Sequence, residues 1–144
     1  MNQERSKTPV HLWIVGILAV LWNAIGCFDY YATQTKMESY MSNFTPQQLE
    51  YFYAFPAWAD AAWAVGVWGS LLGAIGLLLR KAWAVWLFGL AILGLAVTTV
   101  YNFLLSDGLA IMGSGAAMFS GVIWVVALFL FFYAQAMAKR RVLA

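Results

Sequence analysis

Charged residues are scarce in this 144-residue sequence: Asp, Glu, Lys and Arg together make up 10% of it, whereas 64% is hydrophobic. The mean hydropathy is +0.77. Because an average soluble domain is about 25% charged, the chain has too little charge to cover a water-soluble surface. Four stretches without Asp, Glu, Lys or Arg can each hold the roughly 20 apolar residues of a membrane-spanning helix. They lie between Lys7 and Asp29, Asp60 and Arg80, Lys81 and Asp107, and Asp107 and Lys139.

Cysteine and histidine occur once each, as Cys27 and His11. A single cysteine forms no internal disulfide, and one histidine with one cysteine builds neither a zinc site nor a bis-histidine haem site. The sequence also offers no nucleophile paired with a base and no phosphate-cradling loop. We therefore expect no catalytic residue, no metal, no cofactor and no enzymatic activity, and no nucleic-acid partner.

Two interpretations of Cys27 are open. The residues Ala24-Ile25-Gly26-Cys27 loosely resemble a lipoprotein cleavage site, which would imply lipidation of the cysteine. An uncleaved helix with an inert thiol is favoured, because Ala24 stands three residues before the cysteine, where Leu is usual, and Trp22-Asn23 interrupts the apolar stretch.

The charge-free stretches predict an all-α fold, an integral membrane antiparallel four-helix bundle in a single transmembrane domain over residues 1–144. Helices pair all their backbone groups inside hydrocarbon, and these runs lack the period of two that a membrane barrel needs. The turn residues Arg80-Lys81 and Ser106-Asp107-Gly108 separate the later spans. The spans are expected at about residues 10–31, 57–79, 82–105 and 114–137.

The first outer loop, residues 32–56, contains the signature of a short helix. Thr45-Pro46-Gln47-Gln48 places Thr at the N-cap, Pro at the first helical position and Gln three residues after the cap. Aromatic and apolar residues follow, so this helix should lie at the membrane interface until Pro56 turns the chain into the second span.

Basic residues are distributed unevenly between the two sides. With four spans, both chain ends and the turn at residues 80–81 share one side, which carries seven basic residues, whereas the other side carries only Lys36. Positive residues stay cytoplasmic, so we expect both termini in the cytoplasm. The seven are Arg5, Lys7, Arg80, Lys81, Lys139, Arg140 and Arg141.

Polar residues gather toward the outer ends of the first three spans. A helix rises 1.5 Å per residue, so Asp60 lies about 30 Å from Arg80, at the outer edge of the hydrocarbon. No carboxylate is therefore expected at mid-membrane, which argues against a proton antiporter of the small four-helix kind. We expect an outward-facing ligand-binding pocket formed by Asn23, Asp29, Tyr30, Asp60, Thr98, Tyr101 and Asn102.

These residues also have structural explanations. A carboxylate such as Asp60 near a helix N-terminus is favoured by the helix dipole. An amide such as Asn23 commonly forms an interhelical hydrogen bond worth about 0.6 kcal/mol. Tyrosines anchor at the headgroup level, and polar groups concentrate at the wet end of a bundle without any ligand.

Small residues recur every fourth position in the second and fourth spans. Such rows allow close helix approach, either inside one bundle or, as the alternative, at a dimer seam. The rows are Ala62, Gly66, Ser70 and Ala74, and Gly113, Ala117 and Gly121.

Several strings together resemble a group of small bacterial inner-membrane proteins of unknown function, some of them labelled "sugar transporter". They are Leu21-Trp22-Asn23, Phe28-Asp29-Tyr30, Phe44-Thr45-Pro46, Pro56-Ala57-Trp58, Gly66-Val67-Trp68-Gly69 and Leu105-Ser106-Asp107-Gly108. The resemblance covers nearly the whole chain and implies a multi-pass four-helix protein of a bacterial inner membrane. It carries over no site residues.

Two function classes follow, both with the lipid bilayer as the surroundings. The first is a module that binds or transports a small polar solute through the outward pocket, as a homo-oligomer because four helices leave little room for a pathway. The second is an accessory or structural subunit that docks a larger membrane protein partner.

Overall fold

The computed structural model describes residues 7–144, which form helices, turns and loops and contain no strand. Residues 1–6, which include Arg5 of the predicted basic cluster, lie outside the described residues. The helical segments are α1 (Val10–Gln34), α2 (Glu38–Met41), α3 (Pro46–Tyr53), α4 (Ala57–Leu78), α5 (Trp83–Val100), the π-helical η1 (Tyr101–Leu105), α6 (Gly108–Met112) and α7 (Ser114–Lys139).

Four segments are long and apolar enough to cross a membrane: α1, α4, α5 continued by η1, and α7. Their ends lie within three residues of the predicted spans, so the four expected helices are confirmed as helices. Proline sets several starts, because all three prolines stand at one: Pro9 and Pro56 are the N-caps of α1 and α4, and Pro46 is the first residue of α3. Proline is tolerated there because its missing N–H would have no helical partner.

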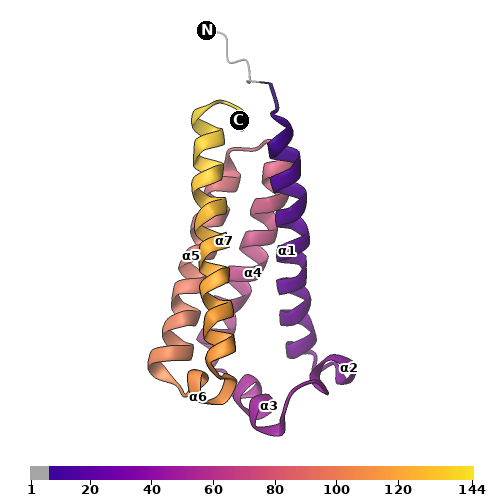
Figure 1. The fold of residues 1–144 in the computed structure, drawn as a ribbon, viewed down its shortest axis with the longest axis vertical. Helices are drawn as coiled ribbons and strands as arrows, with labels where there is room; N and C mark the ends of the chain where they lie inside the picture. The colour runs from indigo at the N-terminus through magenta and orange to yellow at the C-terminus, as the bar shows by residue number, and fades with distance from the viewer. Residues whose placement is uncertain (1–6) are drawn as a thin grey trace.

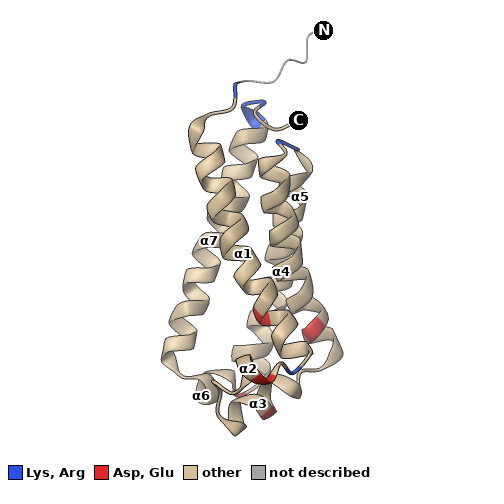
Figure 2. Ribbon diagram, turned by 90° about the vertical axis from the view of Figure 1, so that its right-hand side faces the viewer, with Lys and Arg blue, Asp and Glu red and all other residues tan. Residues whose placement is uncertain are grey.

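The long helices lie side by side, and each begins at the end of the molecule where the preceding one finishes (Figure 1). The basic end carries the first described residues, the α4–α5 turn and residues 140–144. The opposite end, the loop end, carries α2, α3 and α6. Figure 2 shows the blue Lys and Arg segments at the basic end, apart from one, and the red Asp and Glu segments toward the loop end.

α4 and α5 form the most extensive helix contact, and glycine makes their close approach possible. A Cβ atom at Gly94 would lie 2.6 Å from the carbonyl oxygen of Ala62, and one at Gly66 would lie 3.6 Å from the backbone N of Leu95. The predicted row of small residues in the second span therefore packs against α5 of the same chain. The row in α7 differs, because a Cβ at Gly121 would meet nothing within 4 Å among the described residues.

The hydrophobic core is concentrated near the basic end. Leu12, Leu77 and Phe88, from α1, α4 and α5, are each at most 1% exposed. Leu130 and Ala134 of α7 join the same cluster. The four long helices are thus held together where the apolar side chains interlock.

Residues 142–144 fold back onto the α4–α5 turn, a feature that the sequence did not predict. The backbone N of Ala82 donates to the carbonyl of Ala144 (2.9 Å), and the N of Ala144 donates to the carbonyl of Arg80 (3.1 Å). The Nε of Arg80 also donates to the carbonyl of Val142 (3.1 Å), whose side chain is only 1% exposed. These contacts close the basic end.

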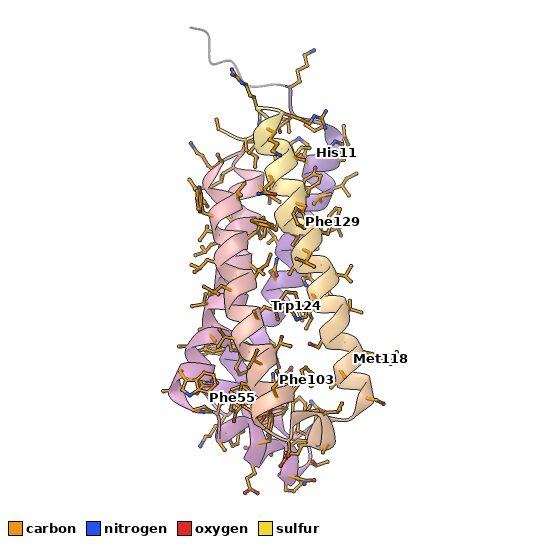
Figure 3. The ribbon with its side chains drawn as sticks, turned by 90° about the vertical axis from the view of Figure 1, so that its left-hand side faces the viewer. His11, Phe55, Phe103, Met118, Trp124 and Phe129 are labelled. Carbon is orange, nitrogen blue, oxygen red and sulfur yellow. The ribbon has the colours of Figure 1, made fainter. Side chains whose placement is uncertain are left out.

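α7 is the least buried long helix: 6% of its apolar stretch is buried, against 22–28% in the other three. It meets α1 at the basic end, where Nδ1 of His11 and the hydroxyl of Tyr133 lie 2.5 Å apart. Toward the loop end its ribbon diverges from that of α1 (Figures 2 and 3), and the Trp22 and Phe119 rings, with centroids 5.9 Å apart, bridge the two helices. There the Trp124 indole N–H donates to the Thr99 hydroxyl of α5 (3.0 Å).

Candidate functional site

The loop end begins with α3, whose start is the predicted one. The Thr45 hydroxyl accepts a hydrogen bond from the backbone N of Gln48 (3.1 Å), and the Gln48 side chain accepts one from the backbone N of Thr45 (3.1 Å). The predicted capping box is therefore confirmed. α3 contacts α1 and α6, so it spans the loop end between the first and third long helices.

A pocket of about 70 Å³ lies where the end of α1 meets α3 and the first turn of α4. The Gln34 amide donates to the Asp60 carboxylate (3.0 Å) at one wall. The Lys36 ammonium lies 4.7 Å from the centre of the Tyr53 ring at another, a cation–π distance. Its lining is Thr33, Gln34, Lys36, Phe52, Tyr53 and Asp60.

Lys36 reaches this pocket because α1 ends in a left-handed turn. Its backbone has φ of 54°, and the N–H of Met37 donates back to the carbonyl of Ala32 (2.9 Å). This is the Schellman arrangement, in which glycine is usual at the left-handed position. A lysine there reverses the chain and leaves its ammonium beside the aromatic wall formed by α3.

Asp29 lies apart from the pocket and links α1 to α2. Its carboxylate accepts a hydrogen bond from the Tyr40 hydroxyl (2.5 Å), and the Tyr40 ring packs edge-on against Phe28 with centroids 5.4 Å apart. Burial raises the pKa of Tyr40, and the hydrogen bond to Asp29 raises it further. Tyr40 therefore remains a donor to the carboxylate at neutral pH.

Asn102 is held by Tyr51 of α3. The Tyr51 hydroxyl donates to the Asn102 side-chain carbonyl (2.6 Å) and lies 2.7 Å from the Ser106 hydroxyl. Burial raises the pKa of Tyr51, and the hydrogen bond with Ser106 offsets part of this rise. Ser106 in turn donates to the backbone carbonyl of Tyr101 (2.7 Å). A side chain at Gly108 would overlap the Asn102 carbonyl, so this junction requires glycine.

Tyr30 and Tyr101 belong to an aromatic network. Tyr30 packs against Trp63 with ring centroids 4.9 Å apart, and Tyr101 packs against Phe55 at 4.8 Å. Phe55 and Trp63 are themselves 5.9 Å apart. α1, α4, η1 and the segment after α3 are therefore tied together by rings, in the edge-on and tilted geometries that aromatic pairs prefer.

Asn23 and Thr98 lie deeper and use their polar atoms within the helices. The Asn23 amide donates to the carbonyl of Ala19 (2.9 Å) and, less closely, to that of Ser70 on α4 (3.5 Å). The Thr98 hydroxyl donates to the carbonyl of Gly94 (2.9 Å). The Cys27 thiol is buried and donates to the carbonyl of Val67 (3.3 Å).

Of the seven residues predicted to share a pocket, Asp60 lines the pocket at the loop end. The other six lie elsewhere: Asp29 at α2, Tyr30 and Tyr101 in the aromatic network, Asn102 at the Tyr51 junction, Asn23 between α1 and α4, and Thr98 bonded within its own helix. The residues that accompany Asp60, among them Thr33, Gln34 and Lys36, were missed. The one signal for them was the polar composition of residues 33–36, directly after the predicted end of the first span.

Within residues 7–144, no group of three or more His, Cys, Asp or Glu side chains is arranged to hold a metal ion. The chain matches no protein-family model, no curated protein sequence and no solved structure.

Proposed function

We propose that the four long helices insert into a bacterial inner membrane as an antiparallel bundle with both termini cytoplasmic. The support is the separation of charge along the helix axes, since the described basic residues other than Lys36 gather at one end (Figure 2). Charged turns at both ends would lie in the headgroup regions, and the exposed apolar faces would contact lipid. The resemblance to small inner-membrane proteins agrees with this proposal and stays a prediction.

For a bundle inserted in this way, we propose that the pocket at the loop end binds a small solute that carries a cationic group. One observation carries this proposal: the pocket combines the Asp60 carboxylate with the Gln34 amide and an aromatic wall. The carboxylate attracts an ammonium group, whereas the Tyr53 ring face is already taken by Lys36. The Lys36 ammonium lies at the same pocket and would pair with a carboxylate of the solute, so an amino-acid-like zwitterion fits its charges.

The size of the pocket narrows the ligand further. Its 70 Å³ is far below the roughly 300 Å³ of pockets that enclose drug-sized ligands. It has room for a few water-sized groups, which suits a small amine or zwitterion better than an enclosed sugar. Transport of such a solute would require opening of the basic end, which residues 142–144 close.

The test is the thermal stability of detergent-purified protein with small amines, amino acids and sugars. A small amine or zwitterion is expected to raise the melting temperature of the wild type and of Glu50→Gln, whose carboxylate is exposed on α3 outside the pocket. The same solute should leave Asp60→Asn unchanged. Stabilisation of Asp60→Asn as large as that of the wild type would contradict the proposal, as would no stabilisation of the wild type by any solute.

A second candidate function, an accessory subunit that docks a larger membrane protein through α7, is favoured by one observation. α7 is 6% buried, and its Gly115 and Gly121 have open space where a Cβ would stand. Glycine there would permit a partner helix to approach closely. Gly121→Cys in a Cys27→Ser background tests this by cross-linking in native membranes. A heteromeric product supports the subunit, whereas monomer alone contradicts it and a symmetric dimer indicates a homo-oligomer.

A further inference from the structure

A groove of about 470 Å³ runs along the surface between α5 and α7, in the half of the molecule nearer the basic end. Val85, Gly89 and Leu93 line it on α5, and Phe131 and Gln135 line it on α7. Figure 3 shows these two helices next to each other above Trp124. The groove shares no lining residue with the pocket at the loop end, so a molecule bound in the groove would not contact the solute proposed for the pocket.

The groove has the shape and surface of a site for a hydrocarbon chain. Three of its five α5 residues, Val85, Gly89 and Leu93, are spaced four apart and share one helix face, so they cover about 12 Å along the helix axis. Gly89 forms the floor, because a Cβ there would already lie 3.4 Å from the Phe131 ring. Trp86 stands at its edge with 80% of its surface exposed, as expected of an indole at a lipid interface.

Polarity increases along the groove toward the basic end. Phe131, Gln135 and Lys139 follow at four-residue intervals and share one face of α7, which places Lys139 about 6 Å beyond Gln135 along the axis. Lys81 lies two residues before the start of α5 at the same end. Both lysines are exposed. An apolar floor, an amide and two ammonium groups therefore follow one another along the axis.

We propose that the groove binds one anionic phospholipid, with an acyl chain along Gly89, its ester group at Gln135 and its phosphate between Lys81 and Lys139. The sequence of chain, ester and phosphate in such a lipid matches the order of surfaces in the groove. A zwitterionic lipid would bring a cationic group close to the same two lysines and bind less tightly. This site rests on insertion of the helices in a membrane but not on solute binding at Asp60.

The test compares phosphatidylglycerol and phosphatidylcholine with identical acyl chains, titrated into detergent-purified protein and measured as bound lipid by native mass spectrometry. The wild type is expected to bind phosphatidylglycerol more tightly. A Lys81→Ala/Lys139→Ala double variant should weaken that binding about 25-fold, since each basic residue near an anionic headgroup contributes roughly fivefold. Because both lysines are exposed, the variant should fold normally. Gly89→Leu, which fills the groove, should weaken binding of both lipids.

Two matched controls separate a built site from general surface attraction. Lys7→Ala removes a basic residue of the same end that precedes α1, and should change the affinity less than twofold. Ala136→Leu adds apolar bulk that is one carbon smaller than that of Gly89→Leu, at an exposed position of α7 outside the groove, and should leave both affinities unchanged. Equal binding of the two lipids by the wild type would overturn the proposal, as would full binding by Gly89→Leu or an equal loss in Lys7→Ala.

Discussion

The Tyr51 hydroxyl connects α3 to the end of the third long helix through Asn102 and Ser106. Tyr51→Phe keeps the ring and removes the hydroxyl that donates to Asn102 and lies beside Ser106, so it should lower the free energy of unfolding by about 1–3 kcal/mol. Equilibrium unfolding in detergent measures this. Tyr53→Phe, at an exposed position on the same helix, is the matched control and should change stability by less than about 0.5 kcal/mol. Equal effects of the two variants would show that the hydrogen bonds add nothing to stability.

Tyr40 predicts a specific response to alkaline pH. Its pKa is raised in the folded protein by burial and by Asp29, whereas in the unfolded chain it ionises near 10. The folded state therefore holds its proton more tightly, and the stability that this contributes is complete below about pH 10 and is lost as the pH rises further. The melting-temperature advantage of the wild type over Tyr40→Phe should be constant from pH 7 to about 9 and shrink above 10. An advantage that grows above pH 10 would contradict this assignment.

The ends of the helices were predictable where a single residue enforces them. Pro56 and the Thr45-Pro46 pair act through local geometry, and the sequence placed both starts correctly. The last turn of α1 was missed because polar residues follow Ala32, whereas the helix runs on to Gln34 and is ended by the bond from the Met37 N–H to the carbonyl of Ala32 (2.9 Å). The π-helical η1 depends on Ser106 and on Tyr51 from a distant helix, for which no local pattern exists.

Glycines of α5 and α7 should respond to alanine with opposite signs. A Cβ at Gly94 would lie 2.6 Å from a backbone carbonyl of α4, so Gly94→Ala should push the helices apart and destabilise the protein by about 1–3 kcal/mol. Gly121 has open space around it, so Gly121→Ala should stabilise α7 by up to about 1 kcal/mol through helix propensity. Thermal unfolding of both variants checks this. Destabilisation by Gly121→Ala would reveal a contact made by α7 with another molecule.

Orientation in the membrane is a prediction for the whole molecule. In a Cys27→Ser background, Ser42→Cys at the loop end should react with a membrane-impermeant maleimide in intact spheroplasts, because the loop end faces outward in the proposed topology. Lys81→Cys at the basic end should react only after permeabilisation. The wild type provides the control, since its Cys27 is 4% exposed and should remain unlabelled. The reverse pattern would contradict the topology.

The candidate site was only partly accessible from the sequence because the sequence gives the faces of helices but not the partners that loops supply. Helical spacing correctly placed Asp60 in the first turn of its span, and it lines the pocket. It could not show that the hydroxyls of Tyr40 and Tyr51, both outside the spans, would donate hydrogen bonds to Asp29 and Asn102. It also could not show how α1 is rotated against α4, which directs Asn23 to a backbone carbonyl.

The fold-back of residues 142–144 has a consequence for biogenesis. The α4–α5 turn is synthesised about 60 residues before the segment that covers it, which at roughly 5–20 residues per second leaves it uncovered for about 3–12 s on the ribosome. During this interval the carbonyl of Arg80 and the N–H of Ala82 have no partner from the later segment. The basic end is therefore covered only after all four long helices have been made.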